Sequence, residues 1–340
     1  MRRPSLKDVA RAAGVSYQTV SRVVNGAGRV SAATRQRVEE AIGQVGYKPS
    51  SLARSLITGR SQMVGLMADG CGRLGGLATL AAVERAAREA GYDVIAASTG
   101  PPDPAAVVAA LDRFERRRVE GVVLIAPSGA TLRAVGASGG AAPAVLLACA
   151  AQPAAGFTAF GEDQGEGARL AARHLAGLGH RDIAHVAGAP GWLDGEARMA
   201  AFRAELELLG IAWRPPVYGD WSGESGYQAG RRLLEGAPPT AVFAASDLMA
   251  LGLIRAFCEA GWRVPEDISV VGFDDAAFAA QACPPLTTVG RDLELVGRRC
   301  VEILTALMRG EQPDTAAPSW ALAPRASCAP PRRRPAGGGR

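Results

Sequence analysis

The chain has 340 residues, of which 48% are hydrophobic and 21% charged, so it is long enough for two or three domains with a sizeable core. No run of about eighteen apolar residues occurs, and the N-terminal MRRPSLKD has no apolar h-region, so we expect neither a membrane span nor a secretory signal. The six cysteines are scattered and form no CxxC pair, which favours reduced, mostly buried thiols over a disulfide or zinc framework. These features together predict a cytoplasmic protein.

The net charge of +5 is unevenly distributed along the chain. Residues 1–60 carry a net charge of +8, residues 61–324 a net charge of −8, and five more arginines follow Pro324. A basic end on an acidic body is typical of a nucleic-acid-binding module joined to a larger domain. A merely solubilising surface is the alternative, but it would not concentrate positive charge at one end.

Residues 5–25, SLKDVARAAGVSYQTVSRVVN, predict two short helices separated by a turn at Gly14. The apolar positions of each helix share one face: Leu6, Val9 and Ala10 in the first, and Val20, Val23 and Val24 in the second. The outer face of the second helix offers side chains that can reach base edges and phosphates in a major groove: Tyr17, Gln18, Ser21, Arg22 and Asn25. This pattern predicts a helix-turn-helix, and the alternative is a small helical domain that binds another protein.

A third helix is expected to begin after Ser31, which can cap it, and to end at Gly46. Its apolar positions, Val38, Ile42 and Val45, would pack behind the first two helices. Pro49 then marks a break, and residues 50–58, SSLARSLIT, place Leu52 and Leu56 four residues apart. This segment is too short to form a stable helix by itself.

From residue 62 onward, short apolar runs alternate with helical patterns. The expected strands are QMVGLMA, DVIAAS, GVVLIAP, RDIAHVAG, TAVFAAS and DISVVGF, and helical stretches such as EGARLAARHLAGLG lie between them. Such alternation predicts parallel sheets with right-handed crossovers. About 270 residues of it suit two doubly wound subdomains, with a ligand beyond the carboxyl ends of the strands.

These segments together resemble the lactose-repressor (LacI) family of bacterial transcriptional regulators. VSYQTVSRVVN and the following VSAATRQRVEEAIGQVGYKPSSLARSL are similar to its headpiece and hinge, and GHRDIAHVAG, GEARMAAFRAEL, PTAVFAASDLMALGLIRAF, DISVVGFDD and PPLTTV to its core. The core of that family is similar to periplasmic sugar-binding proteins. The resemblance covers about residues 5–325. It implies an α helix-turn-helix headpiece plus an α/β periplasmic-binding-protein-like core of two doubly wound parallel-sheet subdomains.

The resemblance also divides the chain. It implies a DNA-binding headpiece at residues 1–48, a hinge helix or linker at 49–60, and an effector-binding and dimerisation core at 61–325. Residues 326–340, rich in Pro, Gly and Arg, are expected to be a disordered basic tail. No leucine heptad follows Leu322, so we expect a homodimer rather than a tetramer.

The family's way of binding DNA implies that two headpieces occupy the two halves of a palindromic operator in double-stranded DNA. In the hinge, Leu56 matches the leucine that wedges between central base pairs in the minor groove; otherwise Leu52 and Leu56 would only pack on the core. The full set of expected DNA-contacting residues is Leu6, Ser16, Tyr17, Gln18, Thr19, Ser21, Arg22, Asn25, Ser31, Thr34 and Leu56.

Three residues match the effector pocket of the family. Arg198 stands in an R-x-x-A-F pattern, and its guanidinium can clamp two hydroxyls, a carboxylate or a phosphate; otherwise it is a surface arginine. Asp274 follows the strand DISVVGF and can accept two sugar hydroxyls, or it can cap a turn. Trp221 can stack on the apolar face of a pyranose, or it can be a packing residue. Trp192 is a weaker candidate near the same cleft.

Several other pocket positions depart from the family's lactose-responsive pattern. Asp69 and Arg73 replace a serine and a leucine, Ser246 replaces an asparagine, and Arg291 replaces a glutamine. An aspartate after the strand PAVLL is Ala148 or Cys149, depending on alignment. These changes put induction by lactose in doubt. The charges at 69, 73 and 291 indicate a more polar, acidic or phosphorylated ligand, or they pair with one another.

The sequence therefore predicts a repressor of carbohydrate-utilisation genes that a sugar-type effector releases from DNA. The alternatives are a corepressor-dependent regulator of the purine-responsive kind and, in a different class, a solute-binding module without a role in gene control. The three histidines, His174, His180 and His185, form no catalytic set with a serine and an aspartate, so we expect no enzyme activity. No cofactor and no metal site are expected.

Overall fold

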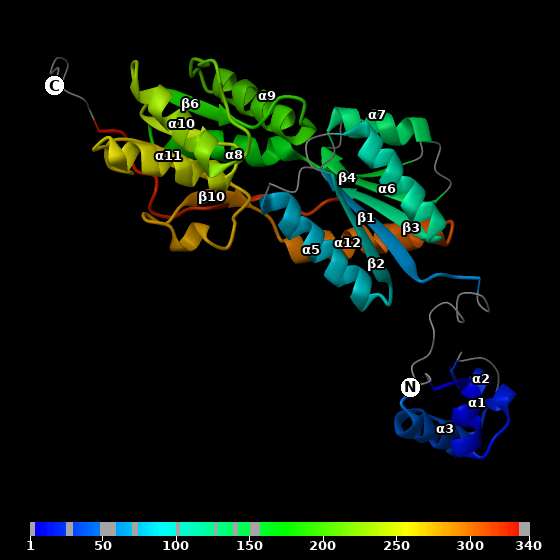
Figure 1. Ribbon diagram of the computed structural model, residues 1–340. Coiled ribbons are helices and arrows are strands. Elements are labelled where there is room, and N and C mark those ends of the chain that lie inside the picture. The colour runs from blue at the N-terminus through cyan, green and yellow to red at the C-terminus, as the bar shows by residue number, and fades with distance from the viewer. Residues whose placement is uncertain are drawn as a thin grey trace. The chain divides into compact units, whose positions relative to one another are not determined.

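The computed structural model describes residues 4–24, 30–47, 59–69, 74–99, 103–125, 128–138, 142–149 and 157–332. The chain forms two compact units, residues 1–62 and residues 63–340. Figure 1 shows the first as a small group of helices and the second as two sheets with helices around them.

The first unit is a three-helix headpiece made of α1 (Leu6–Ala13), α2 (Tyr17–Val24) and α3 (Ala32–Val45). Gly14 ends α1 and Gly46 ends α3, both in the left-handed conformation that glycine adopts at low cost. The Ser31 side chain caps α3 by accepting a hydrogen bond from the backbone N–H of Thr34. The apolar faces of the three helices meet in one cluster, which includes Val9, Val20 and Val38 at 0% exposure. The predicted helix-turn-helix and its third helix are therefore present.

The second unit contains two sheets. The first sheet is entirely parallel, with strand order β2-β1-β3-β4-β5. Its strands are β1 (Met63–Asp69), β2 (Asp93–Thr99), β3 (Gly121–Ile125), β4 (Ala144–Cys149) and β5 (Thr158–Glu162). Helices α5 (Leu74–Glu89) and α12 (Leu293–Met308) pack on one face of this sheet. Helices α6 (Pro104–Arg116) and α7 (Gly129–Ser138) pack on the other face (Figure 1).

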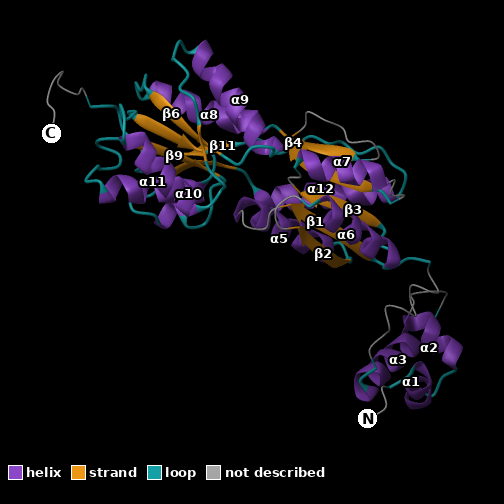
Figure 2. Cartoon of the chain, turned by 45° about the horizontal axis from the view of Figure 1, so that its top comes forward, coloured by secondary structure: helices purple, strands orange, loops and turns teal. Residues whose placement is uncertain are grey.

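The second sheet has strand order β11-β10-β9-β8-β6-β7, with only β11 antiparallel to its neighbour. Its strands are β6 (Ile183–Ala187), β7 (Val217–Tyr218), β8 (Ala241–Ala244), β9 (Ser269–Phe273), β10 (Thr287–Gly290) and β11 (Ala321–Ala323). Helices α8 (Gln164–Gly177) and α9 (Leu193–Leu208) cover one face, and α10 (Gly223–Leu234) and α11 (Asp247–Glu259) cover the other (Figure 2). A short 3₁₀ helix, η1 (Ala279–Gln281), follows β9.

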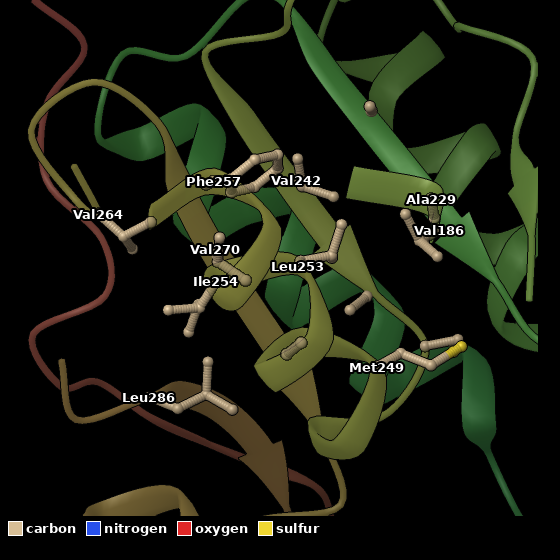
Figure 3. Close-up of a cluster of buried hydrophobic side chains, with 14 of the residues drawn as sticks. Val186, Ala229, Val242, Met249, Leu253, Ile254, Phe257, Val264, Val270 and Leu286 are labelled. Atoms are coloured by element: carbon tan, nitrogen blue, oxygen red, sulfur yellow. The ribbon is translucent and has the colours of Figure 1, made fainter. Parts of the chain in front are cut away.

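The core between the second sheet and α11 shows how the apolar pattern is used. Leu253, Ile254 and Phe257 of α11 pack on Val242 of β8 and Val270 of β9 (Figure 3). All five side chains are at most 5% exposed. This packing fixes the N-terminus of α11 at the carboxyl edge of the sheet, where β8 ends.

The chain passes between the two subdomains three times. It leaves the first sheet at β5 for α8, leaves the second sheet at β10 for α12, and returns from α12 to β11. Helix α12 therefore packs on the first sheet, with Val296 and Cys300 in its core, although the strands on either side of α12 belong to the second sheet.

The start of the expected disordered tail needs correction, because residues 326–332 are part of the second subdomain. Ser327 is 0% exposed, and its hydroxyl donates to the carbonyl of Val270 at 2.6 Å. The backbone N–H of Ala329 donates to Ser269 Oγ at 3.1 Å, and its carbonyl lies 3.0 Å from His180 Nε2. The composition predicted disorder, but these backbone groups find partners on β9. Residues 333–340 lie outside the described part of the chain.

The expected burial of the cysteines holds for only part of the set. Cys300 is buried and Cys328 is half-buried, but Cys258 and Cys283 are exposed, and none of these four forms a disulfide. Within the described ranges, no helix is both long enough and apolar enough to cross a membrane.

Candidate functional site

The headpiece presents a polar face on α2. Tyr17 is 51% exposed, Gln18 and Arg22 are exposed, and Val20 and Val23 are buried on the opposite side. This arrangement follows from the helical spacing of the two valines, which must face the headpiece core. The exposed side chains are of the types that read base edges, so the geometry is compatible with a recognition helix.

The hydroxyl residues of the expected DNA-contacting set have local roles. Ser16 Oγ accepts the backbone N–H of Thr19 at 3.1 Å and so begins α2. Ser31 and Thr34 form the corresponding cap of α3. A capped helix N-terminus leaves other N–H groups that can meet a phosphate.

Other members of that set are less exposed or lie outside the described residues. Leu6 is half-buried against the headpiece core, and Ser21 is half-buried on α2. Asn25 and Leu56 lie outside the described residues, as does Arg73 of the expected effector pocket. Asp69 ends β1, but its side chain is not described.

The second unit contains a cavity of about 500 Å³ beyond the carboxyl ends of its strands. Side chains of both subdomains line it: Thr79, Ile125 and Leu147 from the first, and Arg198, Trp221, Ser246, Asp274 and Arg291 among those from the second. The structure thus gathers five residues that the sequence placed in the effector pocket. Whether they contact an effector stays a prediction. Trp192 is not among the described residues that line the cavity.

Arg198 lies in the wall of the cavity and has several partners within the protein. It is 6% exposed, its Nε donates to Gln164 Oε1 at 2.8 Å, and its Nη1 donates to the carbonyl of Ala245 at 2.6 Å. Its Nη2 lies 3.6 Å from Asp274 Oδ1, and its Cζ lies 3.8 Å from the centroid of the Phe273 ring. Burial excludes the alternative of a surface arginine, and the fixed guanidinium and carboxylate can together bind vicinal hydroxyls.

Trp221 combines packing with exposure to the cavity. Its side chain is part of the hydrophobic core, and the residue is 5% exposed. The indole lies directly on Gly188, where an added Cβ would come within 1.9 Å of Cζ2. Its ring also lies 5.7 Å from the guanidinium carbon of Arg198. The packing alternative is therefore partly correct, although the indole still contributes to the cavity wall.

Ser246 and Arg291 also have partners within the protein. Ser246 caps α11 by accepting the N–H of Met249 at 3.3 Å, and it is 7% exposed. The guanidinium carbon of Arg291 lies 4.6 Å from the centroid of the Trp320 ring. Stacking of a guanidinium on an indole fixes the plane of the arginine in the cavity wall.

Further cavity residues were missed by the sequence analysis: Gln164, Asp194, Asp247, Asp275, Phe278 and Trp320. Two of them adjoin predicted residues, because Asp247 follows Ser246 and Asp275 follows Asp274 at the ends of β8 and β9. Applying the carboxyl-end rule to every residue after each strand would have found both. Trp320 precedes an antiparallel edge strand, and no pattern in the sequence indicates its place.

The acidity of Asp247, in the wall of the cavity, is strongly perturbed. It is 2% exposed, and its burial, together with the negative charge of Asp274, raises its pKa to about 8. Its carboxyl group is therefore largely protonated at pH 7. A strongly perturbed carboxyl group in a cavity is a common feature of functional sites.

Comparison with known proteins agrees with this arrangement. Residues 5–50 match the family "Bacterial regulatory proteins, lacI family", and residues 172–328 match "Periplasmic binding protein-like domain". The lactose operon repressor of Escherichia coli (strain K12) is 36% identical over 313 residues, 92% of this chain and 86% of the repressor. The transcriptional regulator CelR of Thermobifida fusca is 35% identical over 328 residues, 91% of this chain and 93% of CelR. The repressor PurR of Haemophilus influenzae (strain PittEE) is 31% identical over 303 residues, 88% of this chain and 90% of PurR.

Solved structures show the same likeness. A crystal structure of the lac repressor dimer bound to operator and the anti-inducer ONPF has a TM-score of 0.85 at 34% identity, covering 96% of this chain and 100% of the repressor chain. A CelR–cellobiose complex has a TM-score of 0.69 at 32% identity, covering 96% of this chain and 100% of the CelR chain.

A helix-turn-helix headpiece followed by a periplasmic-binding-protein-like domain defines a class of DNA-binding transcription regulators. Within that class, the chain belongs to the LacI family of bacterial regulatory proteins. The resemblance seen in the sequence and the predicted fold class are both confirmed.

Proposed function

We propose that this LacI-family regulator is a repressor of carbohydrate-utilisation genes, and that a sugar-type effector releases it from its operator. The observation that carries the proposal is the cavity in which Arg198 and Asp274 lie 3.6 Å apart beside the indole of Trp221. A guanidinium and a carboxylate suit the hydroxyls of a sugar, and an indole suits its apolar face. The relation to CelR, whose complex contains cellobiose, supports a sugar effector.

The protein would act as a homodimer on a palindromic operator in the cytoplasm, where bacterial DNA lies. Two headpieces reach two half-sites, so the symmetry of the protein matches that of the operator. The lac repressor, of similar structure, binds its operator as a dimer. Residues 16–22 would contact the base edges and phosphates of each half-site. Leu56 would wedge into the minor groove between the two half-sites.

A corepressor-dependent regulator is the second candidate. The relation to PurR supports it, as do the aromatic residues of the cavity wall, Trp221, Phe278 and Trp320, which could stack on a planar ligand. In that case the ligand would strengthen operator binding. Both mechanisms need a ligand that binds the DNA-binding and DNA-free conformations with different affinity.

A binding experiment separates the candidates. An operator is first selected from random DNA by the purified protein, and its affinity is then measured by fluorescence anisotropy with sugars, sugar phosphates and nucleobases. A sugar that weakens binding supports the proposal, and a nucleobase that strengthens it supports the second candidate. Failure to enrich any DNA sequence would contradict both and favour a solute-binding module without a role in gene control.

A further inference from the structure

The turn that follows β9 holds two consecutive non-glycine residues in the left-handed region. Asp274 has a φ of +106° and Asp275 a φ of +46°. L-amino acids rarely adopt such backbone angles, and they persist only where the surroundings hold them. Asp274 is the residue whose carboxylate lies opposite Arg198 in the cavity. Whatever holds this turn therefore decides where that carboxylate points.

Asp247, at the start of α11, anchors the turn with its side chain, in addition to the backbone hydrogen bond that the N–H of Asp274 donates to the carbonyl of Val289 at 2.7 Å. Its Oδ2 accepts the backbone N–H of Ala276 at 2.7 Å, and its Oδ1 and the hydroxyl oxygen of Thr288 share a hydrogen bond at 2.5 Å. The same hydroxyl oxygen accepts the backbone N–H of Asp275 at 3.4 Å. One buried carboxyl group thus connects the turn both to α11 and to β10.

A second anchor comes from the C-terminal segment. Arg325 Nη2 donates to Asp275 Oδ1 at 2.7 Å. Glycines on the two neighbouring strands leave room for the anchored side chains. A Cβ on Gly272 would lie 2.2 Å from Asp247 Oδ1, and a Cβ on Gly290 would lie 2.2 Å from the Cβ of Asp275. The absence of a side chain at Gly272 and Gly290 therefore allows Asp247 and Asp275 to take the positions in which they hold the turn.

We infer that Asp247 and Arg325 are positioning residues of the cavity, which hold the turn at residues 274–276 so that Asp274 faces Arg198 and a bound ligand. Both act through the turn. Their link to ligand binding rests on the proposed function, whereas their hold on the turn does not.

The charges around Asp247 give this role a dependence on pH. The charged groups that face it are Asp274 and Asp275, whose partners are Arg198 and Arg325. Burial and the charge of Asp274 raise the pKa of Asp247 to about 8, so at pH 7 it holds the turn without adding a second negative charge. Above that pH it ionises, and repulsion between the two carboxylates should turn Asp274 away from its place.

Crystal structures of two variants without ligand test the hold on the turn. In Asp247→Ala we expect residues 274 and 275 to leave the left-handed region and the ion pair between Arg198 and Asp274 to separate. In Asp247→Asn, which keeps the shape and one acceptor, we expect both to remain. An Ala variant that retains both positive φ angles and the ion pair would overturn the inference. If the Ala variant does not fold, Arg325→Met takes its place with the same criteria.

Calorimetric titration from pH 6.5 to 9.5 tests the link to ligand binding, with cellobiose and with ONPG, which is bound in a solved structure of the lac repressor. Wild-type affinity should fall about tenfold between pH 7 and pH 9, and that of Asp247→Asn should stay constant over this range. Asp267→Asn is the matched control, because Asp267 is paired with Arg263 at 3.0 Å outside the cavity, and it should follow the wild type. Equal pH profiles for wild type and Asp247→Asn would refute the role in ligand binding. If neither sugar binds, neither is the effector of this protein, and the crystal structures decide the positioning role alone.

Discussion

His185 makes the stability of this protein depend on pH in a way that can be measured. It lies in β6 at 1% exposure, stacked on Phe243 with ring centroids 4.9 Å apart and an interplanar angle of 14°. Its Nδ1 is 3.0 Å from the carbonyl of Phe243 and so carries the proton that is donated there. Burial is the main cause that lowers the pKa of His185 to about 4, and the positive charge of Arg198 contributes to the same shift, so the ring is neutral.

The size of the effect follows from the gap between the two pKa values of this histidine. An unfolded histidine titrates near 6.5, and the gap to about 4 corresponds to about 3 kcal/mol, at about 1.4 kcal/mol per pH unit. Above pH 6.5 both states are neutral and the full stability is present. Between pH 6.5 and about pH 4, His185 is protonated in the unfolded state but stays neutral in the folded state, so stability is lost progressively as the pH falls through this range. Such a loss is a large share of the stability of an ordinary domain.

The assay compares urea unfolding of the wild type and of His185→Asn, followed by tryptophan fluorescence at pH values from 7.5 to 4.5. The variant should be less stable at pH 7.5, because it loses ring packing. The difference in free energy of unfolding between the wild type and the variant should shrink by about 1.4 kcal/mol per pH unit below pH 6. Asp247, whose raised pKa removes stability as the pH rises from about 4 to about 8, acts equally in both proteins and cancels in the difference. A difference that stays constant with pH would refute a buried, neutral His185.

Three further predictions concern function. Gln18→Ala should change the preferred operator, with about 1–3 kcal/mol lost at the contacted base pair, and identical sequences from binding-site selection would remove Gln18 from base reading. Leu56→Ala should weaken operator binding more than nonspecific binding at the same salt concentration in gel-shift assays; equal weakening would make residues 50–58 a simple linker. Arg198→Ala should keep operator affinity and lose the response to ligand in an operator titration, and an unchanged ligand midpoint would place the effector elsewhere. In a corepressor mechanism, that variant would bind the operator weakly even with ligand present.

The headpiece could be predicted almost residue by residue because its signals are local. Gly14 and Gly46 end helices by adopting backbone angles that other residues avoid, and Ser31 begins one by capping it. The spacing of Val20 and Val23 then decides which side of α2 faces outward. None of these inferences needs a contact between distant parts of the chain.

The C-terminal segment shows where local reasoning fails. Its proline and arginine content predicted disorder from residue 326, yet Ser327 and Ala329 hydrogen-bond to β9. The partners, Ser269 and Val270, lie about sixty residues earlier in the sequence. The Nε2 of His180 also lies within hydrogen-bond distance of Ser269 Oγ and of the carbonyl of Ala329. Composition describes the segment alone and contains no information about the first residues of β9, to which the segment hydrogen-bonds.

The cavity is intermediate between these two cases. The rule that ligand groups follow parallel strands supported Asp274, whereas Ser246 came from the resemblance to the LacI family; both lie beyond the ends of strands. Applied to every residue after each strand, the rule would also have found Asp247 and Asp275, but it gave no reason to examine Trp320, whose position depends on how the last crossing of the chain packs. Three of the missed residues support predicted ones: Gln164 bonds to Arg198, Trp320 stacks on Arg291, and Asp247 bonds to the turn that carries Asp274.

The three passages of the chain between the subdomains explain why a ligand in this cavity could act on the shape of the second unit. Gln164 begins the segment after the first passage and holds Arg198; Arg291 lies on the second, and Trp320 lies at the end of the third. Arg291 stacks on Trp320, so two of these passages are in direct contact at the cavity wall. Any change in the angle between the subdomains must bend these three segments. A ligand that contacts these segments would bind two conformations with different subdomain angles with different affinity. Only this difference in affinity can shift the equilibrium between the two conformations.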